Sequence, residues 1–170
     1  MKFRTLTFGF TLILLVSCSN KNHSDITIAS NTEFSFLDGE KKQLHDYAGK
    51  WLFVNFWSVS CAPCFKEMPE LEKLQQELSN TNLNVIGVAM PYDRPDLILK
   101  TQQRKKLAYP LVIDILGKVN LAFGKVEVVP TSFLVNPEGV IIKKFVGITP
   151  FKTLKPFILE QQSKYQAGNI

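Results

Sequence analysis

The feature that most constrains this chain is an unbroken apolar run followed almost at once by two closely spaced cysteines. Residues 51–57, WLFVNFW, contain a single polar residue, and runs of this length are typical of strands buried on both faces of a sheet. Cys61 and Cys64 follow, separated by Ala-Pro. Between residues 62 and 79, apolar side chains recur at spacings of three and four, which predicts a helix with one face toward the core. Together these patterns indicate an α/β domain.

The rest of the chain continues the alternation of strands and helices. The further expected elements are, in chain order, a β-hairpin at 33–44 around Asp38-Gly39, a buried strand at 83–90, a helix at 94–107, a short strand at 109–114, a short helix at 117–124, a second hairpin at 131–147, and a last helix capped by Thr149 with Pro150 in its first turn. This order predicts a mixed central sheet flanked by helices, with an N-terminal β-hairpin extension.

The start of the chain has the pattern of an export signal. Lys2 and Arg4 precede an apolar run at 8–16 and a small residue, as in secretory signals. The run is too short to span a bilayer, which takes about 20 residues. The following LVSC, residues 15–18, resembles the lipobox of bacterial lipoproteins, in which the cysteine, here Cys18, becomes the acylated N-terminus. The alternative is an ordinary signal peptide that is cut elsewhere.

We therefore divide the chain into a lipoprotein signal peptide at 1–17, a lipid anchor and polar tether at 18–31, and one globular domain at 32–165. One domain is consistent with 170 residues of which 45% are hydrophobic and 21% charged. The formal net charge is only +5, and the basic cluster at 104–106 ends a predicted helix, where cations complement the helix dipole. We expect no nucleic-acid partner.

Three kinds of site are compatible with the Cys61–Cys64 pair taken alone. A structural zinc site needs four ligands, whereas the chain adds only Cys18, His23 and His45, so no metal is expected. A structural disulfide across two residues removes little entropy from the unfolded chain. A redox-active pair at a helix N-terminus is favoured, because the helix dipole and the free N–H groups stabilise a thiolate on Cys61. The expected redox group is thus the disulfide itself, with no further cofactor.

The residues around the pair resemble a known family. Residues 49–74, GKWLFVNFWSVSCAPCFKEMPELEKL, and 128–147, VVPTSFLVNPEGVIIKKFVG, are similar to the TlpA/ResA-like envelope oxidoreductases of the thioredoxin superfamily, and the likeness covers most of residues 31–160. The resemblance implies a thioredoxin fold. Asn55 stands where cytoplasmic thioredoxins carry a buried Asp, as it does in the TlpA/ResA group. Ser60 departs from the family, which usually has Trp before the first cysteine.

The resemblance also implies roles for individual residues. Cys61 attacks a partner disulfide and Cys64 resolves the mixed disulfide. Glu67, three residues after Cys64, matches a family glutamate that exchanges a proton with the second thiol. Its spacing alone also fits a solvated face shared with Glu70 and Lys73, so both interpretations stay open.

A second group of residues is implied to bind the partner. The Val129-Pro130 peptide bond is expected to be cis and to face the disulfide, with Val129 presenting its backbone to the substrate; an ordinary trans proline at a strand start is the alternative. Trp57 is placed in the same substrate-binding group, although a core aromatic at a strand end explains it equally well.

From these features we expect a monomeric thiol-disulfide oxidoreductase of the bacterial cell envelope, lipid-anchored with its domain toward the periplasm or cell exterior. Its expected partners are disulfides of exported proteins, such as those of apocytochrome c, and a membrane dithiol donor. The Ala-Pro dipeptide between Cys61 and Cys64 resembles that of family members that act as reductants, so we expect the enzyme to reduce its partners.

Three other functions were considered. A peroxiredoxin-type thiol peroxidase would need Pro-x-x-x-Thr-x-x-Cys, but Val54 and Ser58 occupy the first two positions. A copper-binding protein of this fold would space its cysteines by three and add a His after residue 45. A scaffold lipoprotein would leave the pair inert.

Overall fold

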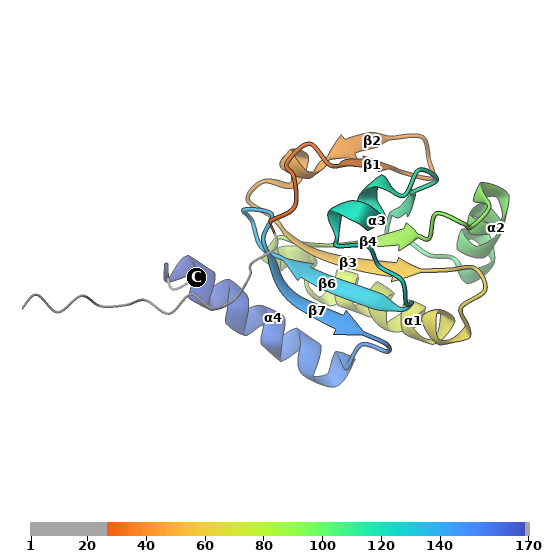
Figure 1. The fold of residues 1–170 in the computed structure, drawn as a ribbon. Coiled ribbons are helices and arrows are strands. Elements are labelled where there is room, and N and C mark those ends of the chain that lie inside the picture. The colour runs from red at the N-terminus through yellow and green to blue at the C-terminus, as the bar shows by residue number, and fades with distance from the viewer. Residues whose placement is uncertain (1–26, 169–170) are drawn as a thin grey trace, which may run out of the picture.

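The computed structural model describes residues 27–168, and its centre is a five-stranded mixed sheet (Figure 1). The strand order is β5-β4-β3-β6-β7. The first three strands run parallel to one another, whereas β6 is antiparallel to both β3 and β7. The strands are β3 (Trp51–Trp57), β4 (Leu83–Ala89), β5 (Leu111–Ile113), β6 (Thr131–Val135) and β7 (Ile141–Val146). The predicted mixed sheet is confirmed.

The central strand β3 is buried along its whole length, as its apolar sequence predicts. Alternate side chains enter two separate cores: Phe53 and Trp57 point to one face, and Val54 and Phe56 point to the other. At the end of the strand, Trp57 pairs with Ala89 of β4 and Phe56 pairs with Thr131 of β6. The end of β3, the end of β4 and the start of β6 therefore meet at one edge of the sheet.

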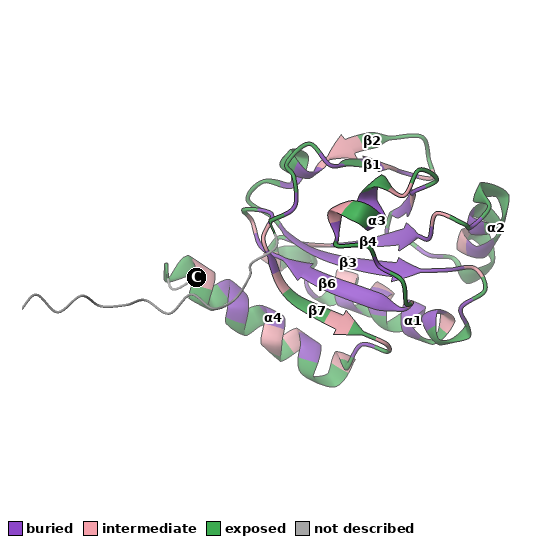
Figure 2. Ribbon diagram, viewed as in Figure 1, coloured by how far each residue is buried: buried purple, intermediate pink, exposed green. Residues whose placement is uncertain are grey.

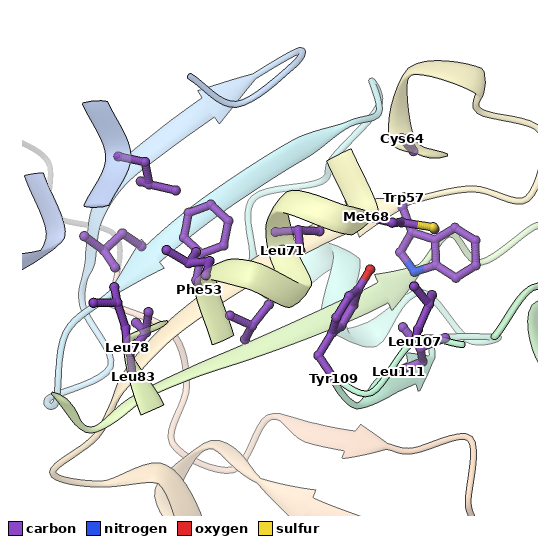
Figure 3. Close-up of a cluster of buried hydrophobic side chains, with 14 of the residues drawn as sticks. Phe53, Trp57, Cys64, Met68, Leu71, Leu78, Leu83, Leu107, Tyr109 and Leu111 are labelled. Atoms are coloured by element: carbon purple, nitrogen blue, oxygen red, sulfur yellow. The ribbon is translucent and has the colours of Figure 1, made fainter. Parts of the chain in front are cut away.

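Two long helices cover the first face. Helix α1 (Ala62–Glu77) lies under β3 and β4, and α4 (Phe151–Gln166) packs beside it (Figure 1). Helix α2 (Pro95–Lys105) flanks the sheet at the edge where β3 ends. The apolar stripe of α1 is confirmed, because Met68 and Leu71 are buried in the same core as Phe53 and Trp57 (Figure 3). Figure 2 shows the resulting pattern of buried strands between helices with exposed outer sides.

The N-terminal hairpin and a short helix cover the second face. Strands β1 (Glu33–Ser35) and β2 (Lys41–Gln43) form the predicted antiparallel pair, and α3 (Lys118–Ala122) lies between them and the sheet (Figure 1). Two 3-10 turns, at Leu44–Tyr47 and Ser79–Thr81, complete the elements.

The domain begins earlier than the sequence patterns predict. Thr27 forms a β-bridge with Val140, Ile28 donates its N–H to the Gly139 carbonyl at 3.0 Å, and the Ile28 side chain is buried in the second core. The predicted boundary after residue 31 is therefore too late, since the last tether residues pack on the turn between β6 and β7. The predicted signal peptide and Cys18 lie outside the described residues.

Candidate active site

The two cysteines lie at the start of α1, a few residues after the end of β3. They are joined in a disulfide with a Cα–Cα distance of 5.3 Å. Cys61 is the N-cap of α1, and Cys64 lies in its first turn. The Cys61 side chain is 8% exposed and the Cys64 side chain 2%. The outer sulfur is thus the one a partner reaches first, and the inner sulfur lies behind it.

The helix start is built to hold negative charge on Cys61. Its Sγ atom accepts a hydrogen bond from the Cys64 backbone N–H at 3.1 Å. Pro63 occupies the first turn, where its missing N–H leaves no bond unmade. When the disulfide is reduced, the same N–H and the helix dipole stabilise a thiolate at this atom.

Glu67 is buried one turn further along α1, with 1% of its surface exposed. One carboxylate oxygen accepts from the Thr149 backbone N–H, and the other accepts from the Asn55 side-chain amide at 3.4 Å. The amide of Asn55 also donates to Ser132 Oγ at 2.9 Å. The alternative that placed Glu67 on a solvated face is therefore wrong: residues from β3, β6 and the β7–α4 loop enclose it.

Burial raises the pKa of Glu67 above its ordinary value, and the hydrogen bonds from Thr149 and Asn55 lower it only in part. A carboxyl group of this kind can take up or release a proton closer to neutral pH than a surface glutamate. Residues three apart on a helix lie on the same face, so Glu67 and Cys64 are neighbours along α1.

Thr149 has a different role from the predicted one. Helix α4 begins at Phe151 with Pro150 as its N-cap, and no side chain caps it. Thr149 instead gives its backbone N–H to Glu67, and its hydroxyl lies 3.3 Å from Ser132 Oγ. The prediction of a Thr149 cap is therefore wrong, because the helix begins one residue later and the hydroxyl that would cap it lies beside Ser132 instead.

The Val129-Pro130 peptide bond is cis, as the resemblance implies. It lies immediately before β6, whose first residue pairs with the end of β3. The Pro130 carbonyl accepts from the Gly147 N–H at 2.8 Å, so the chain after β7 runs alongside. Val129 is partly buried and Pro130 is buried.

Trp57 is a core residue in this structure. Its side chain has no exposed surface, and it packs with Met68 and Tyr109 beneath α1 (Figure 3). An added Cβ on Gly87 would lie 3.3 Å from Trp57 Nε1 and 3.0 Å from the Tyr109 ring, so the glycine makes room for both rings. With its indole enclosed in this way, Trp57 offers no surface to a docked partner, in contrast to the expected substrate contact.

A residue that sequence reasoning missed fixes the turn before Cys61. The Asp93 carboxylate accepts from Ser58 Oγ at 2.9 Å and from the Val59 N–H at 3.0 Å. The Ser58 hydroxyl also lies 3.0 Å from Ser60 Oγ. Asp93 lies in the loop after β4, four residues beyond Ala89, and parallel strands end at the same edge, which is a signal that pointed to this contact. Ser58, at the peroxidase threonine position, thus has its hydroxyl engaged by Asp93 and Ser60.

Three exposed apolar side chains lie next to residues of the site in the sequence. Tyr92 precedes Asp93, Val128 precedes Val129, and Ile148 precedes Thr149; they are 65%, 58% and 60% exposed, respectively. Within residues 27–168, no group of three or more His, Cys, Asp or Glu side chains is placed to hold a metal ion. Over the same residues, no helix is long and apolar enough to cross a membrane.

A thioredoxin-type sheet with a disulfide at the mouth of its first long helix defines the class of thiol-disulfide oxidoreductases. Comparison with known proteins agrees. The AhpC/TSA family profile matches residues 27–144. The thiol-disulfide oxidoreductase ResA of Bacillus thuringiensis subsp. konkukian is 31% identical over 131 residues, covering 76% of this chain and 74% of the relative. ResA of Halalkalibacterium halodurans is 36% identical over 120 residues, covering 70% and 66%.

A solved structure supports the same assignment. The thioredoxin domain of a thiol-disulfide oxidoreductase from Bacteroides vulgatus superposes with a TM-score of 0.66 at 26% identity, covering 79% of this chain and 98% of that one. The chain belongs to the AhpC/TSA family and, within it, to the ResA-like thiol-disulfide oxidoreductases.

Proposed function

We propose that this chain is a lipid-anchored disulfide reductase of the bacterial cell envelope that acts on exported proteins. The observation that carries the proposal is the arrangement of the two sulfurs at the start of α1. The outer one, on Cys61, accepts a hydrogen bond from the backbone, and the inner one, on Cys64, is shielded. Exchange needs one sulfur that a partner reaches and a second that resolves the mixed disulfide.

The reaction starts from the reduced enzyme. The Cys61 thiolate attacks one sulfur of the partner disulfide, that S–S bond breaks, and the second partner sulfur leaves as a thiolate. Cys64, after losing its proton to the Glu67 carboxylate, attacks Cys61 Sγ. The first partner sulfur leaves in turn, and the Cys61–Cys64 disulfide forms. The partner gains two electrons and the enzyme loses two, which a membrane dithiol donor replaces.

The burial of Glu67 supports its role in this sequence. Its raised pKa lets it hold the Cys64 proton and then release it within the same cycle. The partner would lie as an extended segment along Val129 and Pro130, which precede β6 at the edge where the disulfide sits. Apocytochrome c, whose haem-site cysteines must be reduced before haem attachment, is the substrate we favour.

A trapping experiment tests the exchange reaction. Cys64→Ala, expressed in a bacterial host with its signal intact, lacks the thiol that releases the partner from Cys61. The partner therefore stays attached as a mixed disulfide and is identified by mass spectrometry. Cys61→Ala is the matched control and should trap nothing. The purified wild-type domain should reduce insulin disulfides, and Cys61→Ala should abolish this. An empty trap together with an inactive wild-type domain would overturn the proposal.

The anchor is tested separately. Wild-type protein should incorporate radiolabelled palmitate and fractionate with membranes, whereas Cys18→Ser should lose the label and become extractable by salt. We further propose that the domain acts as a monomer, so sedimentation of residues 27–168 should give the mass of a single chain. Label retained in Cys18→Ser would refute acylation at this cysteine.

A further inference from the structure

The turn that precedes the nucleophile is held by a single carboxylate. Asp93 is 7% exposed and binds both the hydroxyl of Ser58 and the N–H of Val59. The Ser60 N–H in turn donates to Ser58 Oγ at 3.2 Å, and the Cys61 N–H donates to the Ser58 carbonyl at 3.0 Å. Every residue from 58 to 61 is thus bonded either to Asp93 or to its partner Ser58.

This hydrogen-bond network includes Ser60, the position at which the sequence departs from its family. Ser60 stands where a tryptophan is usual, and its hydroxyl lies 3.0 Å from Ser58 Oγ. A tryptophan at this position has no hydroxyl with which to make that contact. The aromatic wall beside the first cysteine is therefore replaced by a polar turn that is hydrogen-bonded to the loop after β4.

The carboxylate also brings negative charge to this turn without a cation to balance it. Its sequence neighbour Arg94 pairs with Asp96 at 3.0 Å instead, and in the part of the chain that the structure describes no ion pair of Asp93 is found. Glu67, the other buried carboxylate of the site, is bonded to Thr149 inside the core. Within residues 27–168, the Ser58 hydroxyl and the Val59 N–H are the two donors that offset the charge of Asp93.

We propose that Asp93 is a positioning residue of the redox site that fixes the Ser58–Ser60 turn and, through its buried charge, raises the energy of the Cys61 thiolate. A less stable thiolate makes the dithiol a better electron donor, because oxidants of this fold owe their strength to a stabilised reduced form. The inference rests on the proposed function and deepens it, since it gives a structural reason for the reducing direction.

Two variants separate the charge from the contact. In Asp93→Asn, the side-chain oxygen still accepts from the Val59 N–H, and the amide donates to Ser58 Oγ, so the turn is kept and the charge is lost. Ser58→Ala is the matched control, because it removes one contact and leaves the charge in place. Should Asp93→Asn fail to fold, Asp93→Ser removes the charge with a smaller side chain and is measured in the same way.

Two measurements follow the thiolate directly. The pH dependence of iodoacetamide alkylation, in a Cys64→Ala background, gives the pKa of the Cys61 thiol. Equilibration with dithiothreitol redox buffers at pH 7 and pH 9, with both cysteines present, gives the reduction potential.

We expect Asp93→Asn to lower the pKa of the Cys61 thiol, with an increase of about tenfold in its acid dissociation constant. The reduction potential should become less negative by an amount that grows from pH 7 to pH 9, up to about 30 mV, which is a tenfold change for a two-electron couple. This growth with pH is specific to charge, because Asp93 acts on the thiolate and not on the neutral thiol. Ser58→Ala should stay within about threefold of the wild type in the acid dissociation constant of Cys61 and in the redox equilibrium constant with dithiothreitol.

Equal shifts in Asp93→Asn and Ser58→Ala would overturn the inference, since the contact and not the charge would then be responsible. An unchanged thiol pKa in a folded Asp93→Asn protein would overturn it as well. Neither result touches the proposed function, which fails only if wild-type protein does not reduce protein disulfides. The alkylation measurement needs no partner and so tests Asp93 independently.

Discussion

Replacing Glu67 with Gln should slow the release of the reduced partner without preventing attack by Cys61. In this step Cys64 must lose its proton before it attacks Cys61 Sγ, and Glu67, one turn away and enclosed by Thr149 and Asn55, is the group placed to accept it. A positioned general base accounts for about 10²–10⁴ in rate. We expect a loss of about 100-fold, at the lower end of this range, because water also accepts the proton.

The hydrogen bonds of Glu67 explain why glutamine is the appropriate substitution. Glu67→Ala would leave the Thr149 N–H without an acceptor and the Asn55 amide with Ser132 Oγ as its remaining partner. An unsatisfied buried donor costs about 1–3 kcal/mol, so slower exchange in this variant could reflect unfolding and not loss of the base. Glu67→Gln keeps an oxygen for Thr149, and a rotated Asn55 amide can accept from the new NH₂ group.

The effect of Glu67→Gln on the stability of the folded state depends on pH. Burial raises the pKa of Glu67, so the ionised carboxylate destabilises the folded state as pH rises above about 4.5. Glu67→Gln should therefore gain stability relative to wild type between pH 4.5 and pH 8.

The assay is a single turnover of reduced enzyme with a model protein disulfide, quenched with acid and resolved by mass. Wild type should show little mixed disulfide, whereas Glu67→Gln should accumulate it and release it about 100 times more slowly. The rate of formation, set by Cys61, should match wild type and serves as the internal control. Release at the wild-type rate at pH 7 would refute the assignment of Glu67 as the base.

Three further predictions concern the surroundings of the site. Gly87→Ala should lower stability by about 1–3 kcal/mol, because its Cβ would lie 2.7 Å from Leu111 Cδ2; an unchanged melting temperature would contradict the packing described around Trp57. Asn55→Asp places a second carboxylate beside Glu67, so chemical denaturation should show a larger loss of stability at pH 8 than at pH 5, and a loss independent of pH would argue against charge repulsion. Tyr92→Ala should raise KM severalfold for a protein substrate and leave turnover of a small aromatic disulfide unchanged; equal effects on both would show that Tyr92 does not contact the partner.

Much of the fold was predictable because its strands, helices and turns are determined by patterns among residues close together in the sequence. The apolar run of β3, the spacing along α1 and the Asp38-Gly39 turn each depend on neighbours within a few residues, and the structure confirms all three. The same holds for the cysteine pair, whose position at a helix start follows from the strand before it and the stripe after it.

The surroundings of Glu67 were not predictable in this way. Helical spacing places it beside Glu70 and Lys73, yet its partners Thr149 and Asn55 come from positions 82 and 12 residues away. Burial of a single carboxylate depends on which loop the fold brings over it, and no local pattern records that. The start of the domain was missed for the same reason. Ile28 lies in a polar segment that has the composition of a tether, and only the fold brings the turn at Gly139 beside it. Asp93 is different, because its position in the loop shortly after a buried strand was visible in the sequence.

The contact of Thr27 and Ile28 with the turn between β6 and β7 also fixes how the enzyme can work when its N-terminus is held. This turn lies at the end of the sheet opposite the disulfide, and β3, with seven residues, separates the two ends by about 20 Å. An anchor such as the one proposed at Cys18 would therefore join the domain at the end opposite the disulfide. Such an anchor would restrict where the enzyme diffuses and leave the disulfide end of the domain open to a partner.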